Sequence, residues 1–119
     1  DETEQKIPAL YHAAAGSWYG ENVLHIHDED ILNAVRYHTT GRAGMSRLEE
    51  CVYLADLISE DRTYKDVGRM RRLAFEDING AMLEAARFTL SDVIAKGSFI
   101  PENSMQTYNY YTALIKQDK

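Results

Sequence analysis

Three side chains stand where a helical pattern predicts apolar residues, and their types suit metal binding or acid–base chemistry. Asp56 shares a predicted helical face with Leu48 and Val52, and His38 closes the apolar face of the preceding helix. A carboxylate that faces a core is protonated or needs a partner, which is an arginine, a helix N-terminus or a metal ion. His12 differs, because its neighbours at helical spacing are small and leave room beside the ring. These neighbours are Pro8, Ala9, Ala15 and Gly16.

The three residues together favour a metal site. Imidazole and carboxylate are ligands that suit iron, manganese and zinc, and helical bundles build such sites from facing helices. Each residue also has an ordinary alternative, because a lone histidine is often a hydrogen-bonded core residue and Asp56 could pair with Arg62 or Arg42. Two histidines and one aspartate, predicted to point inward from three successive helices, indicate a metal site, although three ligands do not complete one.

Other polar groups have simpler explanations. The adjacent pair His27 and Asp28 could bind a metal, but Asp28 reads as a helix N-cap, and His25 lies in a predicted loop. Cys51 has no Cys or His at metal-finger spacing, so we expect a half-buried thiol. We expect two further clusters to be structural: a solvated basic face (Arg69, Arg71 and Arg72) and tyrosines packed against the domain (Tyr108, Tyr110 and Tyr111). The sequence contains no catalytic-triad order, phosphate loop or H-E-x-x-H pair.

The elements that would position these residues are all helices. The first helix is predicted over 8–22. The second begins at Asp28 and is broken at Gly41 and Gly44, and the third begins at the capping box of Ser46 and Glu49. Three more helices are predicted over 66–75, 77–96 and 105–115, with a loop at 98–103. No sustained period-two alternation predicts a strand. We therefore expect an all-α fold.

The composition narrows the class of protein. The chain has 119 residues, a formal net charge of −6 and one cysteine, which fits a single globular domain without disulfides. No apolar run approaches the roughly 20 residues of a membrane span, and the acidic balance disfavours nucleic acid as a partner. The chain opens at Asp1 without a leader, so we expect a cytoplasmic location and a segment of a longer protein.

Four stretches resemble the YqeK-type branch of the HD-domain metal phosphohydrolases. They are LYHAAAG at 10–16, ILNAVRYHTTGR at 31–42, GMS at 44–46 and YLAD at 53–56, and the likeness continues to Pro101 and Asn109. The family consists of symmetrical bis(5′-nucleosyl)-tetraphosphatases, which split diadenosine tetraphosphate into two ADP. The resemblance implies an HD-type helical bundle, of which residues 1–119 form the C-terminal part, without its N-terminal helices.

The resemblance also assigns residues. The family's metal centre uses a first His, a His-Asp pair, two further His and a final Asp. His12 and His38 match the two further His and Asp56 the final Asp, so all three are implied to be catalytic, with iron, or alternatively manganese or another divalent metal, as cofactor. His12 and His38 are also implied to contact the substrate, and Arg62 to meet a phosphate. The nucleotide is implied to be held by Phe99, Ile100, Pro101, Glu102, Asn103 and Ser104.

The expected small-molecule partners are a dinucleoside polyphosphate substrate and the product ADP. The expected protein partner is the N-terminal part of the same protein or a second copy, and we expect the isolated chain to be weakly active or inactive. Two alternatives stay open: an HD-type hydrolase of another nucleotide or of a cyclic dinucleotide, and a non-catalytic helical module that binds nucleotide or protein.

Overall fold

The computed structural model describes residues 8–117, and the regular structure of this part is helical throughout. The helices are α2 (Pro8–Asn22), α3 (Glu29–Arg36), α4 (Arg47–Ile58), α5 (Val67–Glu76), α6 (Ile78–Ala95) and α7 (Glu102–Gln117). The predicted all-α fold is therefore confirmed for these residues. None of the described helices is both long and apolar enough to cross a membrane.

The predicted helix starts follow from short-range hydrogen bonds. The Asp28 carboxylate accepts from the backbone N–H of Asp30 at 2.9 Å, which caps α3. The Ser46–Glu49 capping box is complete, since the Ser46 hydroxyl accepts from the Glu49 N–H and the Glu49 carboxylate accepts from the Ser46 N–H. Asp66 precedes α5 as predicted but makes no capping hydrogen bond with its side chain. Local sequence thus determines where most of these helices begin.

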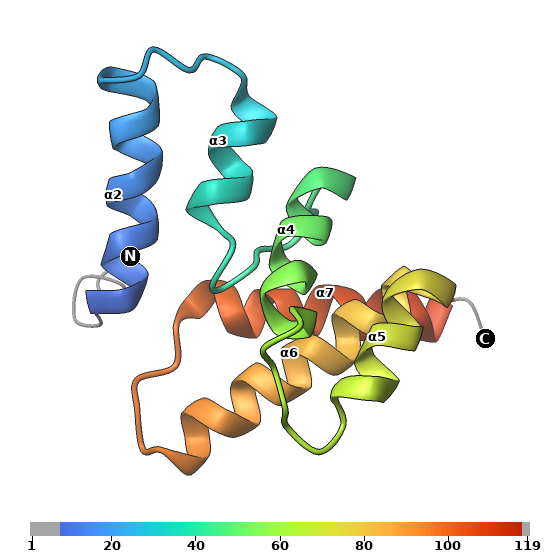
Figure 1. The fold of residues 1–119 in the computed structure, drawn as a ribbon. Coiled ribbons are helices and arrows are strands. Elements are labelled where there is room, and N and C mark those ends of the chain that lie inside the picture. The colour runs from blue at the N-terminus through green and yellow to red at the C-terminus, as the bar shows by residue number, and fades with distance from the viewer. Residues whose placement is uncertain (1–7, 118–119) are drawn as a thin grey trace.

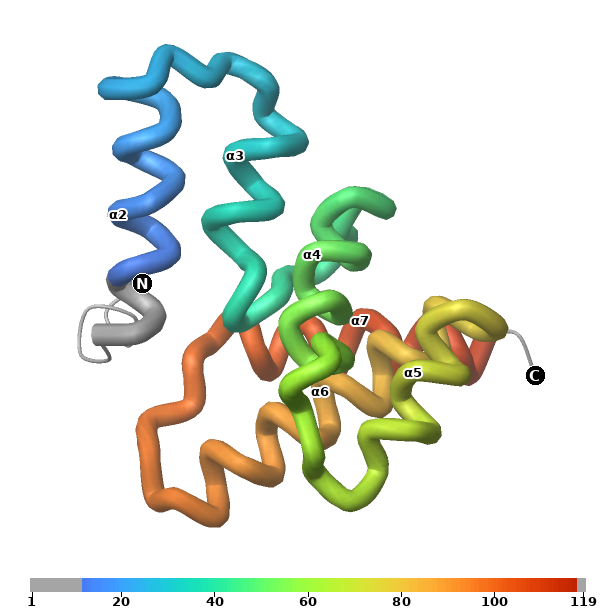
Figure 2. The backbone as a smooth tube through the Cα atoms, viewed as in Figure 1, coloured from blue at the N-terminus to red at the C-terminus, as the bar shows by residue number. Residues whose placement is uncertain are grey.

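The helices form two groups (Figure 1). α2 packs mainly against α3 as an antiparallel pair, and α3 joins this pair to α4. The second group, α4 to α7, encloses the core. α6 and α7 are connected by the turn at 96–101 and pack against each other (Figure 2). The core cluster consists of Met45, Tyr53, Leu54, Met70, Ala81, Met82, Ala85 and Tyr111.

The start of α7 differs from the prediction. Residues 102 and 103 were expected in a loop and the helix was predicted from 105, but α7 begins at residue 102. The carbonyl of Pro101 accepts from the N–H groups of Ser104 and Met105, at 3.1 and 3.4 Å. A proline just before the first turn loses no hydrogen bond there, so the sequence signal of a break marked a helix start.

The buried face of α4 also differs from the prediction. We expected Leu48 and Val52 to face the core, but the buried positions are Glu49, Glu50, Tyr53 and Leu54. Two glutamates can be buried here because each has hydrogen-bonding partners, namely Arg42 for Glu49 and Tyr111 for Glu50. Cys51 was expected to be half-buried, but it is exposed, because it lies on the face of α4 that is turned to solvent.

Candidate active site

His38 and Asp56 line the same cleft, which has a volume of about 260 Å³. The cleft lies between the turn after α3, the second half of α4, the loop that carries Arg62 and the second half of α6. Its lining residues are His38, Thr39, Tyr53, Asp56, Leu57, Arg62, Phe88, Thr89, Asp92 and Val93. A cavity of this size is slightly smaller than most small-molecule sites.

His38 was predicted on the helix itself, but α3 ends at Arg36, and the imidazole is held from the turn that follows. Its Nδ1 lies 2.6 Å from the carbonyl oxygen of Val35, and because a carbonyl only accepts, Nδ1 is the donor. The neutral ring then keeps its free lone pair on Nε2. A histidine whose Nδ1–H is bound to a backbone carbonyl is the usual form of a metal-ligating imidazole.

Asp56 was predicted to face the core, and this prediction is wrong. Its side chain is 58% exposed, and the Nη2 of Arg62 lies 3.5 Å from its Oδ1. Arg62 also donates from Nε to the Asp56 carbonyl at 2.9 Å. The pairing with arginine, one of the alternatives that the sequence left open, is therefore present. Both side chains are exposed to water, so the ion pair contributes only about 0–1 kcal/mol and can be exchanged for another ligand.

The loop that carries Arg62 is held by Arg71, a residue that we had predicted to be solvated. The Arg71 guanidinium donates to the carbonyl oxygens of Ile58, Ser59 and Arg62 at 3.1, 2.8 and 3.2 Å. Three backbone carbonyls bound by one side chain fix the turn after α4. The sequence offered only a cluster of arginines, which did not distinguish this residue from its neighbours.

α6 contributes the wall of the cleft that the sequence did not indicate. The hydroxyls of Tyr53 and Thr89 lie 3.3 Å apart, and burial raises the pKa of Tyr53, with a smaller opposing effect from Thr89. Asp92 is paired with Lys96 at 2.9 Å. Phe88 stacks at a tilt on Tyr64 with ring centres 4.7 Å apart. These residues sit on an ordinary half-exposed helix face, so only the packing of α6 against α4 could reveal them.

The structure does not bring every predicted site residue into the cleft. His12 is exposed on α2 and is not part of the cleft lining. The residues of the segment 99–104 lie outside the lining as well, with Pro101 and Ser104 buried and Phe99 exposed. Within residues 8–117, no three His, Cys, Asp or Glu side chains are grouped closely enough to hold a metal ion. The described part of the chain therefore offers His38 and Asp56 at the cleft but not a complete set of ligands.

Comparisons with known proteins identify relatives over most of the chain. It is 37% identical over 103 residues to the symmetrical bis(5′-nucleosyl)-tetraphosphatase of Bacillus subtilis, a match that covers 87% of this chain and 55% of the relative. The protein of the same name from Halalkalibacterium halodurans is 39% identical over 100 residues, which is 84% of this chain and 54% of the relative. No protein-family model matches the sequence. The chain spans about half the length of the curated relatives it matches.

A solved structure agrees with these relatives. The crystal structure of an HD-superfamily hydrolase from Clostridium acetobutylicum, described as involved in NAD metabolism, superposes with a TM-score of 0.82 at 42% identity. The match covers 86% of this chain and 54% of that chain. The fold of the described residues is therefore that of part of an HD-superfamily protein. Within that superfamily, the chain is similar to the symmetrical bis(5′-nucleosyl)-tetraphosphatases, the proteins that its motifs resemble.

Proposed function

We propose that the protein of which this chain is a part hydrolyses diadenosine tetraphosphate symmetrically to two ADP. The observation that supports this most directly is the shared cleft, where His38, Asp56 and Arg62 meet although they lie on different elements. The names of the two curated relatives supply the substrate and the symmetry of the cut. We further propose that residues 1–119 are the C-terminal part of one HD-type domain, and that this part alone is weakly active or inactive.

The side chains of the cleft suit a polyphosphate. Arg62 would bind a phosphoryl oxygen, because the planar guanidinium matches phosphate geometry and its present partner Asp56 is only weakly held. His38 would direct Nε2 at a ligand, since its Nδ1–H is already donated to Val35. The segment 99–104, which leads into α7 and includes its first residues, would hold the nucleoside end of the substrate. The cationic Arg62 also offsets the negative charge that Asp56 and Asp92 bring to the cleft.

A divalent cation is the cofactor that the HD fold implies, and we propose iron, with manganese or another divalent metal as the alternative. Such an ion supplies an acidic water and neutralises charge on the transferring phosphoryl group. His38 and Asp56 offer the donor types that suit it, and we propose His12 as a further ligand. Because the described residues do not complete a metal site, the remaining ligands would come from the part of the relatives' length that this chain does not match.

The surface around His12 indicates where that part would pack. Tyr19 follows His12 on one face of α2, Val23 comes directly after this helix, and the two side chains are 51% and 45% exposed. The face continues onto α3, because a Cβ added to Gly16 would lie 3.5 Å from the Val35 side chain, which is itself 38% exposed. Apolar side chains gathered beside a predicted metal ligand favour covering by protein. We propose that the N-terminal part of the same protein covers this face.

The reaction is tested on the whole protein with iron or manganese and diadenosine tetraphosphate, by resolving the nucleotide products. ADP as the only product is expected. ATP together with AMP would exclude the symmetrical cut. A panel that also contains NAD and a cyclic dinucleotide tests the alternative of another substrate, which the description of the Clostridium structure makes worth including.

Two variants test the proposed residues. His38→Asn and Asp56→Asn should each lower kcat/KM by about 100-fold or more, a typical loss when a group acts directly in catalysis. His25→Asn is the matched control, because His25 is exposed in a loop outside the cleft and its positive φ of 58° is one that asparagine tolerates. Activity that survives Asp56→Asn, in a protein purified without metal, would instead favour the non-catalytic module.

A further inference from the structure

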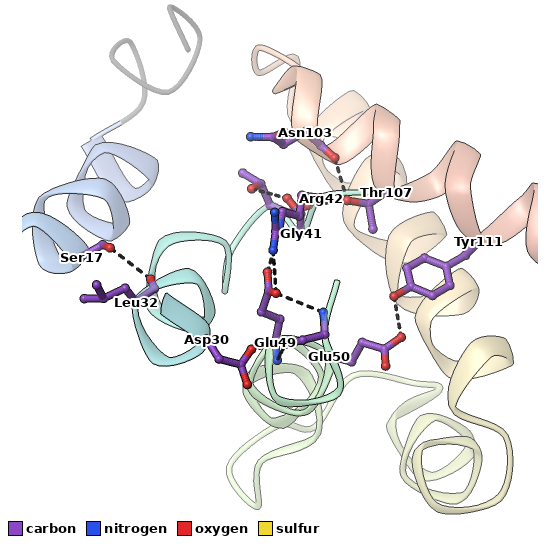
Figure 3. Close-up of polar contacts among 12 residues, drawn as sticks. Ser17, Asp30, Leu32, Gly41, Arg42, Glu49, Glu50, Asn103, Thr107 and Tyr111 are labelled. Atoms are coloured by element: carbon purple, nitrogen blue, oxygen red, sulfur yellow. Dashed lines mark hydrogen bonds and ion pairs between the residues drawn. The ribbon is translucent and has the colours of Figure 1, made fainter. Parts of the chain in front are cut away.

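A buried polar contact joins the segment that carries His38 to the start of α7. Thr40 is only 3% exposed, and its carbonyl oxygen lies 3.2 Å from the hydroxyl of Thr107 and 3.4 Å from that of Ser104. The Thr107 hydroxyl also lies 2.7 Å from the carbonyl of Asn103 (Figure 3). A hydroxyl has one proton, so Thr107 serves one carbonyl at a time while Ser104 can serve Thr40. The two carbonyls and two hydroxyls form one joint.

The joint depends on a close approach that only glycine allows. Gly41 has a φ of +72°, and a Cβ placed there would lie 2.6 Å from Oγ1 and 2.9 Å from Cγ2 of Thr107. The Gly41 N–H donates to the carbonyl of Tyr37 at 2.8 Å, which closes the turn that contains His38. The fully buried side chain of Thr107 therefore rests directly on the backbone of this turn.

The other side of the same turn is fixed to α4. Arg42 donates from Nε and Nη2 to the two carboxylate oxygens of Glu49 at 2.7 and 2.8 Å, and its guanidinium lies 5.0 Å from the ring centre of Tyr37. The turn that carries His38 is thus held at three points. The Nδ1 of His38 is bonded to the end of α3, the residues after His38 rest on Thr107, and Arg42 anchors the turn to α4.

We propose that Thr107 is a positioning residue for His38, and this rests on the proposed role of His38 in the active site. Thr107 does not line the cleft, so it acts through Thr40 and Gly41. Because Thr107 stands one turn after the segment 99–104, the joint also connects the proposed nucleotide-holding segment to His38. Without the Thr107 hydroxyl, the Thr40 carbonyl keeps only the longer contact of 3.4 Å with Ser104, so the turn loosens and the His38 ring loses the fixed direction in which Nε2 points.

The test follows the imidazole of His38 in the whole chain labelled with ¹⁵N, by two-bond ¹H–¹⁵N correlation, without substrate or metal. The wild type should show His38 in the Nδ1–H tautomer. Thr107→Val keeps the shape but removes the hydroxyl, and should lower the ratio of the Nδ1–H to the Nε2–H tautomer about fivefold and accelerate exchange of the Gly41 amide about fivefold, the effect of one lost hydrogen bond. Thr107→Ser should restore both quantities.

Thr112→Val is the matched control. Thr112 lies on the same helix, and its hydroxyl is buried without a hydrogen-bond partner in the described part of the chain, so its removal should change neither readout. The proposal is overturned if Thr107→Val leaves both the tautomer ratio and Gly41 exchange unchanged, or if Thr112→Val alters them equally. Should Thr107→Val fail to fold, Thr107→Ala is compared with Thr107→Ser in the same way, and equal values for the two variants overturn the proposal.

The tautomer is read without turnover, so the two proposals fail separately. A loosened His38 in Thr107→Val together with full activity of His38→Asn in the whole protein would refute the proposed function and leave the positioning contact intact.

Discussion

Replacing Arg42 with alanine should destabilise the fold more at neutral than at acidic pH. The Glu49 side chain is 1% exposed and receives both of its bidentate hydrogen bonds from Arg42 (Figure 3). Burial raises the pKa of Glu49, but the hydrogen bonds from Arg42 and from the Ser46 N–H, with the charge of Arg42, outweigh burial and hold this pKa below its ordinary value. Without the guanidinium, burial becomes the dominant influence and the pKa of Glu49 rises.

The expected cost at pH 7 is about 3 kcal/mol, the low end for breaking a buried ion pair, because the Arg42 side chain is 33% exposed. In the wild type the pKa of Glu49 is lower in the folded state. Its contribution to stability is therefore present above the unfolded pKa of about 4.3 and lost as the pH falls through the folded value. In Arg42→Ala the folded pKa is higher, so stability is lost as the pH rises. The cost should fall to about 1–2 kcal/mol at pH 4, where a protonated Glu49 no longer leaves a buried charge.

The assay is urea unfolding followed by far-UV circular dichroism at both pH values, with an unchanged m-value as the criterion for comparing free energies. Arg69→Ala is the control, because the Arg69–Glu84 pair, 3.2 Å apart, is more exposed and should contribute less than about 1 kcal/mol. A cost for Arg42→Ala below about 1 kcal/mol at pH 7, or an equal cost at both pH values, would refute the assignment of a buried charge that depends on Arg42.

Three further changes probe the fold. Asp28→Ala removes the N-cap of α3 and should cost about 1 kcal/mol in urea unfolding, with faster amide exchange confined to the first turn of α3. Tyr111→Phe removes the donor, at 2.5 Å, to the buried carboxylate of Glu50 and should cost about 1–3 kcal/mol; an unchanged midpoint would show that Arg47 suffices. Gly41→Ala places a Cβ against Thr107 at positive φ and should cost at least about 2 kcal/mol by calorimetry, whereas Gly44→Ala, also at positive φ but with open space around it, should cost less.

The fold could be predicted from the sequence wherever a signal acts over a few residues. The first helix was predicted over 8–22 and is Pro8–Asn22. Asp28, the Ser46 capping box and Asp77 mark helix starts because the side chain bonds to an N–H two or three residues away. The burial of α4 could not be predicted, because Glu50 is buried through a tyrosine 61 residues along the chain. Hydrophobic spacing cannot anticipate a buried acid whose partner is so distant.

The candidate site divides in the same way. The sequence singled out His38, Asp56 and Arg62, and all three line one cleft. The assignment of His12 and of 99–104 to the active site stays a prediction. Asp92, Thr89 and the carbonyl-binding role of Arg71 became apparent only in three dimensions, since each depends on contacts between elements.

By itself, the sequence determined the helical class, the helix starts and the residue types able to bind a metal and a phosphate, because caps, glycine breaks and motifs are properties of neighbouring residues. Tertiary packing alone decided which of those residues share a cavity and which hydroxyls and arginines hold them there. The segment of His38 is an example. The Nδ1 of His38 bonds to a carbonyl three residues back, which any helix supplies, whereas the Thr40 carbonyl meets Thr107 only because α7 folds back against the turn.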